Sequence, residues 1–118
     1  MMYPPSIPEN VKARAFRAGN GELGILPEDT PAFLEACRKD RVEVLGWELW
    51  VVDHEWDFET GLPSRSPGVW MGGIPMRGES LSAVVHGETA EQLADIDLRA
   101  EVEPAWLPHI RVNFTLDD

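Results

Sequence analysis

The amino-acid sequence predicts an α+β fold, in which a mostly antiparallel sheet carries about two helices packed on one face. Residues 42–52 are rich in β-branched and aromatic side chains, which indicates a central strand. Residues 109–116 alternate strictly between polar and apolar side chains, which indicates a second strand. Residues 31–40 place apolar side chains at helical spacing. The short, hairpin-like connections favour antiparallel pairing within one domain spanning residues 1–118.

The first 41 residues predict an arm, a turn and the clearest helix. Residues 1–9 are rich in proline, and we expect an arm on the surface or loosely ordered. The glycines at 19 and 21 predict a tight turn between two short strands, although a short helix over 10–18 also fits. Asp29 is placed to cap a helix over 31–40, with Pro31 at its first position.

The central strand carries apolar side chains in both alternating sets, which predicts that both of its faces are at least partly covered. Trp47 and Trp50 lie on opposite faces, so one of them is expected to be partly exposed unless both faces are covered. Gly46 interrupts the strand and predicts a bulge or the close approach of another backbone.

The remaining elements are shorter. Residues 60–68 have the composition of a loop, and strands are expected at 69–71, 74–76 and 81–85, with Gly72-Gly73 as a break or a hairpin turn. Thr89 and Gln92 match a capping box at the start of a short helix. In the last strand, one face is expected to carry Ile110, Val112, Phe114 and Leu116.

Composition limits the class of function. The 118 residues have a formal net charge of −11 and a pI near 4.6, which argues against nucleic-acid binding by bulk electrostatics and against adhesion to anionic lipid. A single cysteine, no signal-peptide pattern and no apolar run of about 20 residues favour a cytoplasmic protein that does not span a membrane. Eight of the ten basic residues are arginine, a bias typical of GC-rich bacterial genomes.

The net charge is not spread evenly along the chain. Residues 1–41 contain six basic and six acidic residues, whereas residues 42–118 contain four arginines and fifteen acidic residues. Such asymmetry indicates either an interaction surface or a solvated acidic face. The densest acidic segment is residues 53–59, which as a continuation of the central strand would place on one side Asp53, Glu55, Asp57 and Glu59.

This acidic row has three interpretations. It faces water while His54, Trp56 and Phe58 cover the core, or it faces a basic protein, or it holds a hard metal ion. Aromatic side chains supply binding hot spots and carboxylates speed association with a cationic partner. The partner-binding residues expected on this basis are Asp53, Glu55, Trp56, Asp57, Glu59, Trp47 and Trp50.

No pattern in the sequence predicts catalysis, a cofactor or a metal centre. His54, His86 and His109 are far apart and belong to no metal-binding motif, and neither a nucleophile elbow nor a phosphate-binding loop is present. Cys37 lies on the apolar side of its helix, as expected for a small core residue. The competing hypothesis is a small metal-binding or hydrolytic enzyme domain that uses the Asp53–Asp57 carboxylates with His54 or His86.

Residues 42–50, read together with Gly68-Val69-Trp70, resemble small acidic bacterial immunity proteins of polymorphic-toxin and contact-dependent competition systems. The resemblance covers about a third of the chain. It implies an α+β, cytosolic and non-catalytic protein that binds and masks a cognate toxin, often a basic nuclease. The oligomeric state and the identity of the partner stay open.

Overall fold

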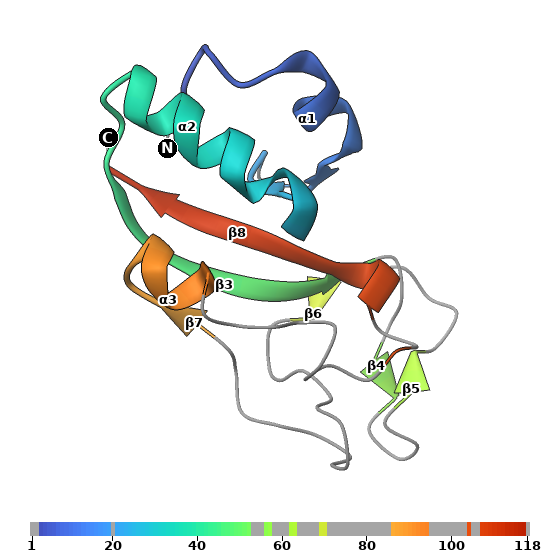
Figure 1. The fold of residues 1–118 in the computed structure, drawn as a ribbon. Coiled ribbons are helices and arrows are strands. Elements are labelled where there is room, and N and C mark those ends of the chain that lie inside the picture. The colour runs from blue at the N-terminus through green and yellow to red at the C-terminus, as the bar shows by residue number, and fades with distance from the viewer. Residues whose placement is uncertain are drawn as a thin grey trace.

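The fold is α+β, as a computed structural model of the chain shows (Figure 1). The structure describes residues 3–19, 21–52, 56–57, 62–63, 69–70, 86–94, 104 and 107–117, and of 56–57, 62–63, 69–70 and 86 it describes the backbone alone. The elements are α1 (Glu9–Arg14), β1 (Phe16–Arg17), β2 (Leu23–Gly24), the 3-10 turn η1 (Pro27–Asp29), α2 (Thr30–Lys39), β3 (Val44–Val52), β4 (Trp56–Asp57), β5 (Leu62–Pro63), β6 (Val69–Trp70), β7 (His86–Gly87), α3 (Ala90–Ala94), η2 (Leu107–His109) and β8 (Ile110–Leu116).

Strand β3 is the centre of a four-stranded antiparallel sheet. Along one edge it pairs with β8, in a register that places Trp47 opposite Phe114 and Leu49 opposite Val112. Along the other edge it pairs with β7 near its middle and with β6 at its end. Beyond β8, Ile25 forms an isolated bridge to Val112, with reciprocal backbone hydrogen bonds of 2.7 Å. The predicted central strand is therefore confirmed.

Both faces of β3 are buried, as the apolar pattern predicts. Trp47, Leu49 and Val51 belong to the main core cluster, while Trp50 and Val52 lie on the opposite face, and all five are at most 4% exposed. On β8, the predicted apolar set is buried with the same face as Trp47. The alternation in residues 109–116 correctly predicted that the apolar side chains of β8 share one face. The lack of alternation in residues 42–52 correctly predicted that β3 is covered on both faces.

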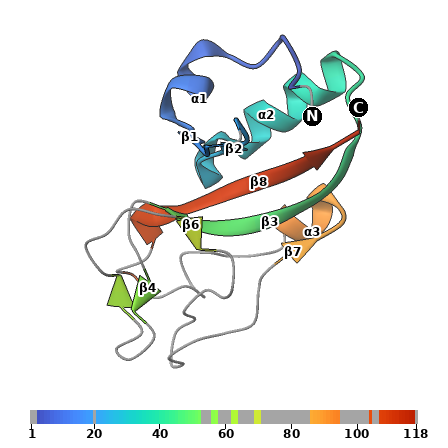
Figure 2. The same cartoon turned by 180° about the vertical axis from the view of Figure 1, so that it is seen from behind.

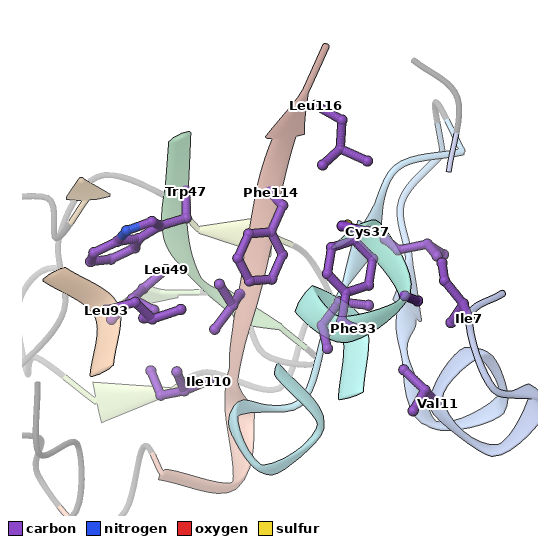
Figure 3. Packing of buried hydrophobic residues seen from close by; sticks show 14 of the residues in the cluster. Ile7, Val11, Phe33, Cys37, Trp47, Leu49, Leu93, Ile110, Phe114 and Leu116 are labelled. Carbon is purple, nitrogen blue, oxygen red and sulfur yellow. The ribbon is translucent and has the colours of Figure 1, made fainter. Parts of the chain in front are cut away.

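Helices α2 and α3 both pack on the face of the sheet that carries Trp47. Phe33 of α2 stacks on Phe114 of β8, with ring centroids 4.7 Å apart. Leu93 of α3 joins the same cluster beside Trp47 and Leu49 (Figure 3). The two helices therefore close one continuous core over β3 and β8.

The β3–β8 register contains a bulge. Val44 pairs with Leu116 and Gly46 pairs with Thr115, so that Leu45 is an extra residue on β3. The backbone of β7 also comes close at this point, because a Cβ atom added to Gly46 would lie 3.2 Å from the Gly87 carbonyl oxygen. Both expectations for Gly46, a bulge and a close backbone approach, are confirmed.

The N-terminal segment packs on the core rather than lying loosely on the surface. Ile7 is buried in the core cluster, and the Tyr3 ring meets Phe33 edge-on with centroids 6.2 Å apart. The Tyr3 hydroxyl accepts a 2.8 Å hydrogen bond from the Leu23 N–H, and burial raises the pKa of this phenol. Asp40, just beyond α2, accepts hydrogen bonds from the backbone N–H and the hydroxyl of Ser6, both 2.7 Å.

Both alternatives for residues 10–24 occur together: α1 is followed by β1 and β2, which pair across a turn in which Gly21 has a φ of 88°. Helix α2 is present where predicted, but Asp29 does not cap it with its side chain. The carboxylate instead accepts hydrogen bonds from Arg14 Nε and Nη2, at 3.0 and 2.5 Å. A two-pronged bond to guanidinium is stronger than a single bond to a helix N–H, which explains the exchange.

Helix α2 ends in a Schellman motif built on an arginine. The Val42 N–H donates to the Cys37 carbonyl (2.8 Å) and the Arg41 N–H to the Arg38 carbonyl (3.3 Å), while Arg41 itself has a φ of 58°. The left-handed conformation at this position favours glycine, because a Cβ atom comes too close to the following carbonyl oxygen.

We expect Arg41→Gly to raise the free energy of unfolding by about 0.5–1 kcal/mol, because relief of the left-handed strain outweighs the extra entropy of the unfolded chain. Urea denaturation measures the change. Lys39→Gly, an exposed substitution inside the last turn of α2, is the matched control and should lower stability by about 1 kcal/mol. A loss of stability in Arg41→Gly would show that its side chain stabilises the helix end.

The predictions for residues 60–94 have mixed outcomes. Leu62–Pro63 lies in the predicted loop but pairs as β5 with β4, whereas β6 confirms a strand at 69–70. The predicted strands at 74–76 and 81–85 lie outside the described residues. The capping box of α3 is confirmed: the Gln92 N–H donates to the Thr89 hydroxyl (3.2 Å), and the Thr89 N–H donates to Gln92 Oε1 (3.1 Å).

Candidate functional site

The predicted acidic row does not continue the central strand in the described part of the chain. Strand β3 ends at Val52, and Trp56–Asp57 forms β4 in a separate two-stranded sheet with β5. Asp53, Glu55 and Glu59 lie outside the described residues, as do the side chains of Trp56 and Asp57. A sequence pattern of alternating acids could not reveal this change of sheet, because strand pairing depends on distant segments.

The two tryptophans assigned to the partner-binding set are core residues in this structure. Trp47 is 4% and Trp50 is 3% exposed, so of the two alternatives for this pair the one that holds is that both faces of the strand are covered. The Trp47 indole N–H donates to the Thr89 carbonyl at 2.8 Å, and that of Trp50 donates to Glu48 Oε1 at 3.1 Å. Burial with a satisfied N–H is typical of a structural tryptophan, and neither ring offers an exposed anchor.

The backbone at Gly24 lies close to Trp50. A Cβ atom at Gly24 would lie 3.1 Å from Trp50 Cε3 and 2.9 Å from Arg111 Cβ, so a side chain at this position would overlap both. The next residue, Ile25, forms the bridge to Val112 at the edge of β8. The end of the β1–β2 hairpin therefore lies against the residues around Trp50.

Charges in the first 41 residues are largely neutralised within that region. Ion pairs join Lys12 to Glu9 at 3.6 Å and Arg14 to Asp29 at 2.5 Å, and a third joins Arg38 to Glu35. Asp40 is held by Ser6, and these hydrogen bonds lower the pKa of its carboxyl group. Three of the six cations of this region are thus paired with acids of the same region, and its formal net charge is zero.

Four of the five acidic side chains described downstream of residue 41 are arranged differently, the exception being Glu48, which accepts the Trp50 hydrogen bond. Glu43, Glu88, Glu91 and Asp117 are exposed, and within the described ranges none of their side chains takes part in an ion pair or hydrogen bond. Glu43 and Asp117 are neighbours, because the Asp117 N–H donates to the Glu43 carbonyl at 2.9 Å. These four side chains are therefore accessible to solvent.

Leu45 is a surface residue that the sequence analysis did not single out. It is 49% exposed, the most exposed large apolar side chain among those that the structure describes. The bulge at this position is the cause, since a regular strand would give residue 45 the inward direction of Trp47 and Leu49. The signal in the sequence was Gly46, which predicted the bulge without predicting which side chain it would turn outward.

The described side chains contain no group of three or more His, Cys, Asp or Glu residues that could hold a metal ion. His54 lies outside these residues, His86 is described by its backbone in β7, and His109 is half-buried in η2. Cys37 is 2% exposed, and burial raises the pKa of its thiol to about 11. Cys37 is therefore a core residue rather than a ready nucleophile, because the thiolate form is disfavoured.

None of the helices in the described ranges is long and apolar enough to cross a membrane. Comparisons of the chain with protein-family models, with curated proteins and with solved structures find no match.

Proposed function

We propose that this protein is a non-catalytic binding protein of the immunity type, which acts in the cytoplasm and masks a basic toxin. Binding would place a negatively charged surface over the cationic surface that the toxin uses on its own substrate. Complementary charge would accelerate encounter between the two proteins and exclude partners of the same sign.

The observation that carries this proposal is the division of charge along the chain. The first 41 residues have no net charge and contain three internal ion pairs, whereas the net charge of −11 arises entirely downstream. Carboxylates that serve only solubility would need no such separation. The exposed side chains of Glu43, Glu88, Glu91 and Asp117, which form no ion pair with any residue that the structure describes, agree with a surface that is left open for an external cation.

The test is direct binding to a defined probe: the purified C-terminal domain encoded by the open reading frame next to this gene. We expect one-to-one binding in calorimetry, and restored growth when both proteins are produced in the same cells. The triple substitution Asp53→Lys, Glu55→Lys and Asp57→Lys should lower the association rate by about 10- to 100-fold without unfolding the protein. The rate should also fall as salt is raised.

The matched control is Glu9→Lys, Glu28→Lys and Glu35→Lys, three exposed acids of the neutral region. Both triple variants change the net charge from −11 to −5, and the control also removes the exposed ion pairs of Glu9 with Lys12 and of Glu35 with Arg38. Equal rates for the two variants would show that the segment 53–57 has no particular role. If the wild-type protein does not bind a basic neighbour-encoded domain and does not protect growth, the immunity function is wrong.

A further inference from the structure

We propose that the docking surface for the cationic partner is the bulged end of β3, where the exposed Leu45 lies among backbone segments that carry Glu43, Glu88 and Asp117. We call these four residues the Leu45 surface. The proposal rests on the proposed binding function and names the place and the chemistry of contact. The Leu45 surface has an apolar residue together with acidic residues, and it therefore matches a basic protein surface that offers a small apolar recess.

The bulge determines the direction of Leu45. Val44 packs against the core and pairs with Leu116, and two residues later Gly46 pairs with the exposed Thr115. A regular strand would turn residue 45 inward with Trp47, but the extra residue reverses this direction and leaves Leu45 49% exposed. Local bulges recur where a side chain is directed toward a functional surface.

Three exposed acidic residues lie on three different backbone segments that meet at the bulge. Glu43 precedes β3, and its carbonyl is bonded to the N–H of Asp117 at the end of β8. Glu88 follows Gly87, whose carbonyl lies beside Gly46. Figures 1 and 2 show from two sides that β7 and α3 lie beside the end of β3 where the chain also terminates. The acids thus come together only through the pairing of β3 with β7 and β8.

The charge of this surface determines the class of its occupant. Anionic lipids and nucleic acids carry the same sign as the carboxylates and are repelled. A second copy of the chain in a symmetric contact would place one set of carboxylates against the same set on the other copy, which is also unfavourable. A cationic protein satisfies both features, because its Lys or Arg side chains pair with the acids while an apolar recess covers Leu45.

The decisive variant is Leu45→Asp, because the added negative charge and the lost apolar contact are expected to change the affinity for a basic partner in opposite directions. If steering by negative charge were the whole interaction, an added carboxylate would leave the affinity unchanged or raise it. If Leu45 is the apolar anchor, we expect affinity for the neighbour-encoded basic domain to fall by about 10- to 100-fold, mainly through faster dissociation. Ala32→Asp, which adds the same charge on an exposed position of α2, is the matched control and should leave the affinity unchanged.

Carbodiimide labelling of carboxylates supplies an independent readout on the wild-type complex. Glu43, Glu88 and Asp117 should be protected by the partner, whereas Glu9 and Glu28 should be labelled as in the free protein. The Leu45 surface would be overturned if the wild-type protein bound the basic domain, Leu45→Asp bound it with the same affinity, and the three carboxylates were not protected. The proposed binding function would then still stand. Absence of wild-type binding would overturn both proposals. The proposal would also be overturned if the wild-type protein formed a dimer, did not bind the basic domain, and became monomeric on substitution of Leu45→Asp. The surface would then bind a second copy of the chain.

Discussion

Replacement of Trp47 by alanine is expected to lower the free energy of unfolding by about 3–5 kcal/mol. The indole is 4% exposed, lies in the core cluster with Leu49 and Leu93, and donates its N–H to the Thr89 carbonyl at 2.8 Å. The substitution therefore removes a large buried ring and the hydrogen bond that ties β3 to the start of α3. Domains of this size are stable by only about 5–15 kcal/mol, so the variant should be close to unfolding at 25 °C.

Trp47→Phe keeps the prediction testable if the alanine variant does not fold. It retains most of the buried volume but lacks the N–H donor, and we expect a loss of about 1–2 kcal/mol. Urea denaturation followed by far-UV circular dichroism is the measurement, since the loss of a tryptophan also alters fluorescence. Leu45→Ala is the control: it removes an apolar side chain of the same strand from an exposed position and should change stability by less than about 0.5 kcal/mol. If Trp47→Ala changed the free energy of unfolding as little as Leu45→Ala, the structural role of Trp47 in the core would be contradicted.

Gly87→Ala is expected to lower the free energy of unfolding by about 2–3 kcal/mol. A Cβ atom on residue 87 would lie 2.7 Å from Trp47 Cζ2 and 2.6 Å from Gln92 Oε1. The indole cannot move, because it is packed in the core, and Gln92 Oε1 holds the N–H groups of Glu88 and Thr89. Relief of the overlap must therefore disturb either the core or the capping box of α3.

Gly19→Ala is the matched control, since a Cβ atom at Gly19 would have no neighbour within 4 Å. Its effect should stay within about 0.5 kcal/mol. Combining Gly87→Ala with Trp47→Phe should cost less than the two single losses together, because the smaller ring vacates part of the overlapping space. Strict additivity, or a Gly87→Ala variant as stable as Gly19→Ala, would contradict the close packing of β7 on Trp47.

These two predictions separate the fold from the proposed function. Trp47 and Gly87 stabilise the junction of β3, β7 and α3 from inside, and the Leu45 surface lies on the outside of the same strands. Variants of the junction should reduce stability and, through it, the amount of active protein. Leu45→Asp should reduce affinity while the unfolding midpoint stays the same. Measuring both quantities for each variant therefore distinguishes loss of folding from loss of contact.

Much of the fold could be predicted from local patterns. The alternation in residues 109–116, the doubly apolar segment 42–52, the helix over 31–40 and the capping box at Thr89 all correspond to observed elements. Each depends on a backbone period of two or 3.6 residues, or on hydrogen bonds within one turn. The surroundings of the proposed partner-binding residues were harder to predict, because a pattern states which side chains share a face and not what covers that face. Trp47 and Trp50 belong to this set and are buried in the structure.

Local sequence patterns were enough to predict the α+β class and the positions of its main elements, and the net charge of −11 comes from residues 42–118. Contacts between distant segments could not be predicted in this way: Asp29 binds Arg14 instead of capping α2, and the Gly24 backbone lies against Trp50. Tertiary structure also decided that Leu45 is turned outward, because the bulge exists only in the register between β3 and β8. The physical reason is the same in each case: periodicity is a property of neighbouring residues, whereas partners and burial depend on segments that folding brings together.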